Sequence, residues 1–403
     1  MIRVAMISPL PPQRTGEAPY TARLITSIVK SGEVRVMALA GEEANPIHAS
    51  GGLTETFPIW KGKSLRYPFV LMKHIKEQRP HLVHVQFGPH GRVYGGMFGE
   101  VMLLLLILLR LLGIRTTVTL HSTWMPWQVK ARIKDHRILG RFAFLASPVF
   151  RLYMWLFDKG TSTVQLSTVR EDSNLRKQFL KTYGFNPEKV LEIPHPCSQP
   201  DPTRTQKASA ESIGLPGRRV ILVFGFIRPG KGLDIAVRAM AQIKETLPDV
   251  VLLIAGRPQS VEGRRQLHEL HNLVLQLDLQ TVVRFDSRFI PDEEVPGYFD
   301  ASALLLVPYT ESVGASGPIH SYAGYGVPIL ASNAGYHNRE SLGGNLFLFR
   351  AGDPEDLSKK LIEVLSSPEL TVTASKRQLE YARRETWDLA ATRTLRNYEK
   401  TLR

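Results

Sequence analysis

The sequence predicts an α/β protein made of two doubly wound, Rossmann-like parallel-sheet domains that face a cleft. Three observations lead to this expectation. The chain has 403 residues, 43% of them hydrophobic, which is too long for a single core of ordinary size. Short β-branched apolar runs alternate with segments of helical period, as in parallel sheets covered by helices on both faces. The alternation stops once, at a proline-rich stretch, and then starts again.

The first series of apolar runs predicts an N-terminal domain over residues 1–197. Its expected strands are IRVAMIS, EVRVMALA, HLVHVQF, TTVTLHS, TVQLST and KVLEIPH. Helices are expected between them, for example over Tyr20–Lys30, Phe69–Gln78 and Glu171–Tyr183. The apolar run Val101–Gly113 is shorter than the roughly 20 residues that cross a bilayer, so it predicts a buried helix.

Residues 198–217 contain three prolines and few large apolar side chains, which indicates a linker. A second domain is expected over 218–385, with strands VILVFGFI, VVLLIAG, VVRFDS, ALLLVPY, VPILAS and NLFLFR. Residues 386–403 form a terminal helix with an apolar face, and packing back on the N-terminal domain is one arrangement it could adopt. Two doubly wound units imply ligands at the carboxyl ends of the strands, in the cleft between the units.

The formal charge of +14 favours anionic partners, which include nucleoside diphosphates, acidic lipid headgroups and nucleic acid. Nucleic acid is disfavoured because the chain has no nucleic-acid motif and no zinc-type Cys/His spacing. The single cysteine, Cys197, cannot form an intrachain disulfide, so a cytoplasmic protein is expected. A second interpretation of Val101–Gly113, or of Phe144–Phe157 with its basic neighbours, is peripheral contact with a membrane surface.

The segment VILVFGFIRPGKGLDIAVRAM indicates a phosphate site. It combines an apolar strand, a glycine-rich turn and a helix start, which present backbone N–H groups and the positive end of a helix dipole to an anion. Gly230 and Gly232 let the backbone approach closely. Arg228 and Lys231 add two cations that can neutralise a departing diphosphate. The alternative is a surface turn with solvated charges.

The same segment matches most of a P-loop, since four residues separate Gly225 from Gly230 and Lys231. The match fails at its last position, where Gly232 offers no hydroxyl to hold Mg²⁺. An ATPase is therefore disfavoured.

A second cluster lies in ALLLVPYTESVGASGPIHSYAGYGVPILAS. Small residues precede a short helix, so their N–H groups can hold another part of the same diphosphate. These residues are Gly314, Ala315, Ser316 and Gly317. Glu311, at the start of the loop, is suited to accept hydrogen bonds from sugar hydroxyls, although an exposed loop acid is the plainer interpretation.

With both clusters in this order, the chain resembles family 4 of the retaining glycosyltransferases, which have the GT-B fold and bind a nucleotide sugar in the C-terminal domain. GFIRPGKGLD is similar to the family's Arg and Lys donor-phosphate motif. FIPDEEVPGYFDASALLLVPYTE is similar to the segment leading to its first motif glutamate, and GYGVPILAS to the small-residue run and strand that follow. The resemblance covers nearly the whole chain.

One position departs from the family pattern, which has two glutamates separated by seven residues. Glu311 corresponds to the first. Alignment on GYGVP places Ser321 at the second, whereas counting from Glu311 reaches Ile319. His320 or Ser321 would then replace the carboxylate that holds the ribose, with weaker hydrogen bonds.

In the N-terminal half, SPLPPQRTGEAPYTARL resembles the family's glycine-rich loop near the diphosphate and acceptor, with Gly16 followed by Glu17 in place of a second glycine. A plain turn glycine is the alternative. In TVTLHSTW, His121 ends an apolar strand, and the resemblance implies that it contacts the donor sugar and stabilises positive charge on the anomeric carbon. A core or surface histidine is the alternative there.

The resemblance implies a hexosyltransferase that moves a sugar to an acceptor hydroxyl with retention of configuration. His121, Arg228, Lys231 and Glu311 would be its catalytic residues, and the acceptor a glycan, a lipid-linked glycan or a small glycoside. No metal and no cofactor beyond the donor are expected, because cations already neutralise the phosphates and the chain has no Asp-x-Asp motif. Two alternatives stay open: a catalytically silent protein that binds nucleotide sugar or membrane, and a sugar-nucleotide epimerase of the same fold.

Overall fold

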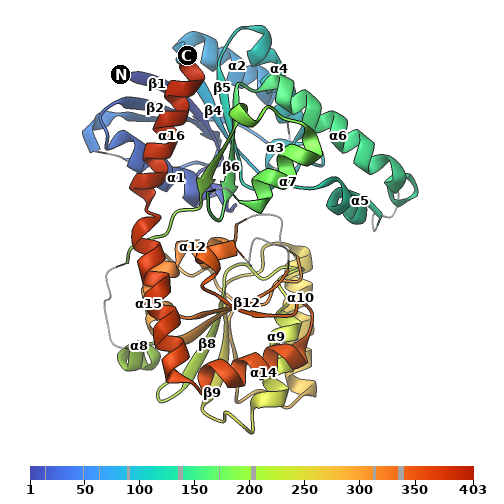
Figure 1. Cartoon of the computed structure of the whole chain (residues 1–403), viewed down its shortest axis with the longest axis vertical. Coiled ribbons are helices and arrows are strands. Elements are labelled where there is room, and N and C mark those ends of the chain that lie inside the picture. The colour runs from blue at the N-terminus through green and yellow to red at the C-terminus, as the bar shows by residue number, and fades with distance from the viewer. Residues whose placement is uncertain are drawn as a thin grey trace. The chain divides into compact units, whose positions relative to one another are not determined.

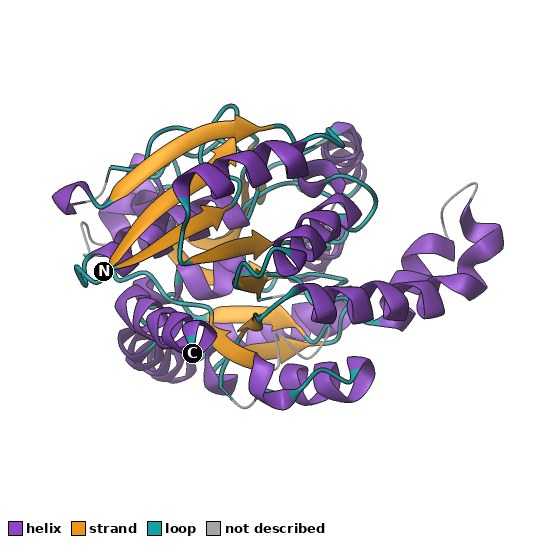
Figure 2. Cartoon of the chain, turned by 90° about the horizontal axis from the view of Figure 1, so that it is seen from above, coloured by secondary structure: helices purple, strands orange, loops and turns teal. Residues whose placement is uncertain are grey.

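The structure, a computed structural model, describes residues 1–13, 15–48, 50–62, 64–88, 91–134, 139–171, 173–200, 206–311, 315–334 and 340–403. The chain divides into two compact units. Unit 1 comprises Met1–Pro194 and Trp387–Arg403, and unit 2 comprises His195–Thr386. In both units, helices lie on the two faces of a sheet (Figure 2).

The described part of unit 1 is built on a seven-stranded parallel sheet with the order β3-β2-β1-β4-β5-β6-β7. The strands are β1 (Ile2–Ile7), β2 (Val34–Gly41), β3 (Thr54–Trp60), β4 (Leu82–Phe87), β5 (Thr116–Leu120), β6 (Thr163–Thr168) and β7 (Val190–Pro194). The helices are α1 (Glu17–Val29), α2 (Tyr67–Gln78), α3 (Gly91–Tyr94), α4 (Glu100–Leu111), α5 (Pro126–Lys134), α6 (Ala143–Gly160), α7 (Asn174–Tyr183) and α16 (Trp387–Leu402).

Unit 2 has a six-stranded parallel sheet in its described residues, with the order β10-β9-β8-β11-β12-β13. Its strands are β8 (Arg219–Phe224), β9 (Val250–Ala255), β10 (Val283–Asp286), β11 (Ser302–Val307), β12 (Ile329–Ser332) and β13 (Phe347–Phe349). Its helices are α8 (Gln206–Ser212), α9 (Leu233–Ile243), α10 (Val261–Gln276), α11 (Val295–Asp300), α12 (Gly317–Ser321), α14 (Pro354–Leu365) and α15 (Pro368–Arg384).

Two parallel α/β sheets confirm the predicted fold class. The interior strands β4, β5, β6 and β9 are buried along their whole length. Strand β9 therefore appears in the sequence as a continuous apolar run, whereas β4 and β6 also bury the polar residues His84, Gln86 and Gln165. Strand β3 has no counterpart among the predicted strands. It contains Pro58 and forms the edge of the sheet, where a missing N–H is tolerated.

The segment predicted as a linker, 198–217, is partly structured. Helix α8 lies within it and packs on α11, with Ala210 and Leu215 buried. Unit 2 begins at His195 rather than at residue 198 or later. Cys197 is buried in the core of that unit, and its backbone N–H donates to the Glu385 carbonyl at 2.7 Å.

Helix α16 packs on unit 1 beside α1 (Figure 1). Its buried side includes Thr394, Tyr398 and Thr401. Arg115 of unit 1 donates to the Thr401 carbonyl at 2.6 Å, and Lys30 forms an ion pair with Asp388 at 3.5 Å. The chain therefore returns to its first domain to complete it.

The apolar run that begins at Val101 forms α4, which buries one side, including Leu105 and Leu109, in unit 1. Over the ranges that the structure describes, no helix has both the length and the apolar character to cross a bilayer.

Candidate active site

The strand order of unit 2 places a ligand-binding position at the ends of β8 and β11. From β8 the chain first builds outward through β9 and β10, and then adds β11, β12 and β13 on the other side. In such sheets, ligands bind outside the carboxyl ends of the two strands where the direction reverses. The two sequence clusters predicted to bind phosphate directly follow these two strands.

The two turns are in direct contact. The Thr310 N–H donates to the Gly230 carbonyl at 3.0 Å. Gly232 lies so close to the β11 turn that a Cβ atom there would be 1.8 Å from the Pro308 carbonyl oxygen. On the other side, a Cβ atom at Gly225 would be 3.9 Å from the Pro318 ring, at the start of α12. Gly232 therefore allows the second cluster to approach, whereas the Pro318 distance at Gly225 would accommodate a Cβ atom.

Helix α9 begins at this place without a side-chain cap. Its N-cap is Gly232, with φ 62° in the left-handed region, and a glycine has no side chain that could accept a hydrogen bond from the first turn. The first N–H groups of a helix have no partner within the helix and carry the positive end of its dipole. Helix α9 is 11 residues long, and its positive end lies next to the turn that follows β11.

Two cationic side chains flank the start of α9. Arg228 is exposed and donates to the Pro229 carbonyl at 3.2 Å, and no ion pair of Arg228 occurs within the described ranges. Lys231 is half-buried and donates to the Tyr309 hydroxyl. Burial lowers the pKa of Lys231 below its usual range, and Arg228 lowers it further, while Tyr309 opposes the shift. An anion bound here would reverse that shift.

Tyr309 was not among the predicted site residues, yet it connects the two turns. It is buried, its ring centroid lies 3.7 Å from Lys231 Nζ, and its hydroxyl accepts from Ser316 Oγ at 3.5 Å. Burial raises the pKa of Tyr309, but the Lys231 cation and the hydrogen bonds from Lys231 and Ser316 outweigh it, so the pKa is lowered. Its position directly after strand ALLLVP was the available signal.

The remaining residues of the second cluster lie around this contact. Glu311 is exposed and follows Thr310, while Ala315 and Gly317 are half-buried and Ser316 is the N-cap of α12. Gly314 lies outside the described residues. Of the positions considered for the second glutamate, Ile319 and His320 are buried in the unit, and Ser321 is half-buried. Ser321 is thus the better placed of the two proposed substitutes.

In unit 1 the corresponding reversal of strand order lies between β1 and β4. Gly16 lies after β1 and is the N-cap of α1, with φ −67°. A Cβ atom there would meet no described atom within 4 Å. Neither backbone conformation nor described packing requires a glycine at this position, so only a ligand that approaches closely would require one.

His121 lies directly after β5 and is held by its neighbours. Its Nε2 donates to Gln86 Oε1 at 2.7 Å, and its ring contacts the Tyr20 ring edge-on, with centroids 4.6 Å apart. The predicted position at a strand end is correct, and the imidazole is oriented by a second side chain that sequence reasoning missed.

A buried polar network continues from Gln86. Its Nε2 lies 3.1 Å from His84 Nε2, and His84 also hydrogen-bonds with Thr119 at 2.8 Å and with Tyr398 at 2.7 Å. The terminal helix α16 is thereby connected to the side chain that orients His121. The signal in the sequence was the alternation of polar His84 and Gln86 within the strand HLVHVQF.

Unit 1 is expected to lose stability in mild acid because of His84. Burial, with a smaller contribution from His121, lowers the pKa of His84 to about 3. Between about pH 6.5 and this value the unfolded chain binds a proton that the folded chain does not, so stability falls as the pH falls. From pH 7 to pH 5 the loss attributable to His84 is about 2 kcal/mol.

The measurement is denaturant unfolding of unit 1 at both pH values, for wild type and His84→Gln. The pH-dependent loss should be smaller in His84→Gln, whereas the exposed-residue control His81→Gln should behave as wild type. An equal loss in all three proteins would contradict the assignment.

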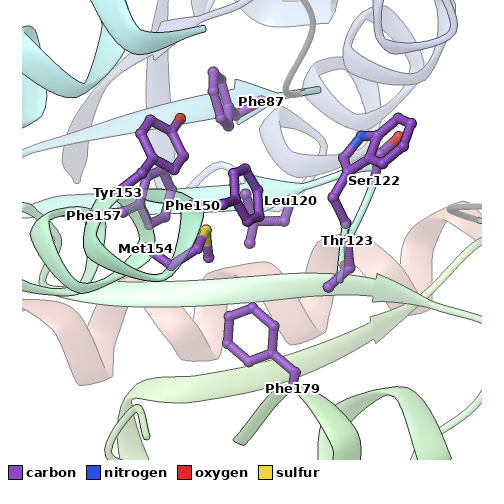
Figure 3. Close-up of a pocket in the computed structure, with 10 residues that line it drawn as sticks. Phe87, Leu120, Ser122, Thr123, Phe150, Tyr153, Met154, Phe157 and Phe179 are labelled. Carbon is purple, nitrogen blue, oxygen red and sulfur yellow. The ribbon is translucent and has the colours of Figure 1, made fainter. Parts of the chain in front are cut away.

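Unit 1 also contains a small apolar pocket under α6, where the side chains of Phe150, Tyr153 and Met154 face those of β4 and β5 (Figure 3). It is lined by Phe87, Leu120, Ser122, Thr123, Trp124, Phe150, Tyr153, Met154, Phe157 and Phe179. No Lys or Arg is among these residues, so the pocket is unsuited to a diphosphate.

One known family matches most of unit 2. Residues 205–384 match the family described as Glycosyl transferases group 1. The matched part is under half of the chain and supports a domain of that group. It contains both turns described above.

Among individual proteins, the chain is 28% identical over 234 residues to D-inositol 3-phosphate glycosyltransferase 2 of Catenulispora acidiphila. The match covers 56% of this chain and 54% of the relative. It is 29% identical over 231 residues to D-inositol 3-phosphate glycosyltransferase of Streptomyces griseus, covering 54% and 48%. The chain thus spans about half the length of the relatives it matches.

Solved structures match over almost the whole chain. Sucrose-phosphate synthase from Thermosynechococcus elongatus superposes with a TM-score of 0.76 at 17% identity, covering 99% of each chain. Anabaena HepE in complex with UDP superposes with a TM-score of 0.69 at 16% identity, covering 99% of this chain and 100% of that one. The chain has the GT-B fold predicted from its sequence.

Proposed function

We propose that this chain, with a glycosyl transferases group 1 domain in unit 2, transfers a sugar from a nucleoside-diphosphate sugar to an acceptor hydroxyl. The observation that carries the proposal is the contact between the two turns after β8 and β11, at the reversal of strand order. It gathers an uncapped helix start and two cations in one place. A diphosphate is the ligand whose charge and size suit that set.

In this proposal, Arg228 and Lys231 stabilise the charge that develops on the departing diphosphate, together with the first N–H groups of α9. Backbone amides of Gly314 to Gly317, and the close backbone approach at Gly230 and Gly232, support the same group. Glu311 accepts hydrogen bonds from the sugar hydroxyls. Ser321 takes the place of the second motif glutamate at the ribose.

Unit 1 contributes Gly16 and His121 in the proposed reaction. Gly16 keeps its loop open for the diphosphate and acceptor, and His121, oriented by Gln86, stabilises positive charge on the anomeric carbon. The proposal includes retention of configuration and independence from metal ions. It also includes a glycan or lipid-linked acceptor in the cytoplasm. Metal independence follows from the cations already present, which supply the charge a metal would otherwise supply.

The relatives from Catenulispora acidiphila and Streptomyces griseus are named as glycosyltransferases, and the structure of HepE was solved in complex with UDP. These names favour transfer from a nucleotide sugar over the other activities of the fold. Ser321, in place of the second glutamate of the resembled pattern, favours one alternative, a protein that binds nucleotide sugar without turnover.

The first test is a thermal-shift screen of the purified protein against nucleotide sugars and nucleoside diphosphates. A ligand at 100 times its dissociation constant should add about 2.7 kcal/mol of stability. Arg228→Ala should lose most of this shift, and Arg238→Ala, on α9 away from the turn, should keep it. No shift with any nucleotide would contradict the proposal. A shift without donor hydrolysis or transfer would instead support the silent alternative, and conversion of the donor without an acceptor would support an epimerase.

A further inference from the structure

Helix α6 has apolar side chains on two opposite sides. Its inner side, with Phe150, Tyr153 and Phe157, is buried against the sheet of unit 1. Its outer side exposes large apolar side chains to solvent: Phe144 (65%), Leu145, Val149, Leu152 (57%) and Trp155 (52%). We call these five residues the outer face of α6. At 100° per residue they fall within one continuous stripe along the helix.

Basic side chains border this stripe. Exposed Arg141 precedes α6, and exposed Lys159 lies 5.9 Å from the Trp155 ring near the end of the helix. Exposed Arg151 lies on α6 and donates one hydrogen bond to the Thr182 carbonyl at 2.7 Å. The neighbouring helix α5 packs on α6 and exposes Trp127, again with cations. Those cations are Lys130, Arg132 and Lys134.

Acidic side chains are nearly missing from the same stretch of sequence. Residues 101–160 contain nine Lys or Arg residues and two acidic residues. Asp135 lies outside the described residues, and Asp158 forms an ion pair with Lys189 at 3.0 Å. An apolar stripe with Trp and Phe, bordered by more cations than carboxylates, is the pattern of a helix that lies in the interface of an anionic membrane. Rims of protein interfaces normally mix both signs of charge.

Within unit 1, the stripe lies where a planar membrane surface can reach it. Helix α5 and the first turns of α6 extend beyond the sheet of the unit (Figures 1 and 2). A side chain on such an extension can reach a planar bilayer before the rest of its unit does.

We propose that the outer face of α6, with the cations on α5 and α6, binds the surface of a membrane containing anionic lipids. Phe144, Leu152 and Trp155 enter the boundary between headgroups and acyl chains, and Arg141, Arg151 and Lys159 contact lipid phosphates. This binding is independent of the proposed sugar transfer, so either can fail without the other.

The experiment is flotation of the full-length protein with vesicles of phosphatidylcholine alone or mixed with phosphatidylglycerol. Wild type should float with the anionic vesicles, less so in high salt, and little with phosphatidylcholine alone. The variant Phe144→Gln/Leu152→Gln/Trp155→Gln should bind the vesicles at least about ten-fold more weakly, because it lacks the three apolar side chains that would enter the bilayer. Arg141→Gln/Arg151→Gln/Lys159→Gln should lose the preference for anionic lipid.

The matched control is Val261→Gln/Leu275→Gln, which removes two exposed apolar side chains of α10 in unit 2. It should bind as wild type. All three variants change exposed residues and should keep the wild-type unfolding transition, which checks that they fold. Absence of wild-type binding, or equal binding by the α6 apolar variant, would overturn the proposal. A wild-type dimer that becomes monomeric in that variant would assign the face to a second copy of the chain instead.

Discussion

Lys231→Ala is expected to lower turnover by about two orders of magnitude or more, the scale seen when one preorganised electrostatic stabiliser is removed. Lys231 is the half-buried cation between the two turns, and it donates to the Tyr309 hydroxyl of the second turn. Its loss removes positive charge where a departing diphosphate would gain negative charge. The measurement is the steady-state rate with the nucleotide sugar found by the thermal-shift screen.

Lys244→Ala is the control, because Lys244 lies at the other end of α9 and donates to the Asp278 carbonyl at 3.3 Å. It should keep the wild-type rate. Tyr309→Phe separates the hydroxyl from the cation: it removes the hydrogen bond but keeps the ring beside Lys231, so its effect should be smaller than that of Lys231→Ala. A wild-type rate in Lys231→Ala would remove this residue from the mechanism.

The pH profile gives a second readout on the same residue. Because burial lowers the pKa of Lys231, kcat/KM should begin to fall at a lower pH than it would if this lysine had its ordinary pKa. A bound diphosphate raises that pKa again, so the alkaline limb of kcat should lie at higher pH than that of kcat/KM. In Lys231→Arg the part of each alkaline limb that comes from Lys231 should disappear, since arginine stays protonated, and Lys231→Arg/Tyr309→Phe removes the titration of Tyr309 as well.

Gly232→Ala is expected to destabilise unit 2 by about 3 kcal/mol or more and to weaken donor binding with it. Two effects add. The residue has φ 62°, a conformation that costs an alanine about 1 kcal/mol or more. Its Cβ atom would also lie 1.8 Å from the Pro308 carbonyl oxygen, so the start of α9 would have to move away from the β11 turn. Denaturant unfolding of unit 2 and nucleotide titration measure the two consequences.

Gly217→Ala separates strain from crowding. Gly217 has a similar φ of 69°, but a Cβ atom there would meet no described atom within 4 Å. It should therefore cost only about 1 kcal/mol and leave nucleotide affinity unchanged. Equal effects of the two substitutions would show that the contact between the turns does not matter for binding.

Much of the candidate site in unit 2 could be predicted from local patterns. Arg228, Gly230, Lys231 and Gly232 follow an apolar strand in one short stretch, and the chemistry of an anion site is visible in those residue types. For Tyr309, the position after an apolar strand was a signal in the sequence, but its partner was not. Its role depends on the distance to Lys231, 78 residues earlier in the chain, and only strand pairing between β8 and β11 sets that distance.

The sequence by itself determined the two parallel sheets, the order of most strands and helices, and the two glycine-rich turns, because periodicity and turn chemistry act over a few residues. The tertiary structure decided what depends on contacts between distant residues. It placed α16 on unit 1, brought Thr310 to Gly230, connected His84 to Tyr398, and showed that the outer side of α6 stays exposed. An apolar residue in the sequence does not reveal which surface covers it, since burial is a property of the packed chain.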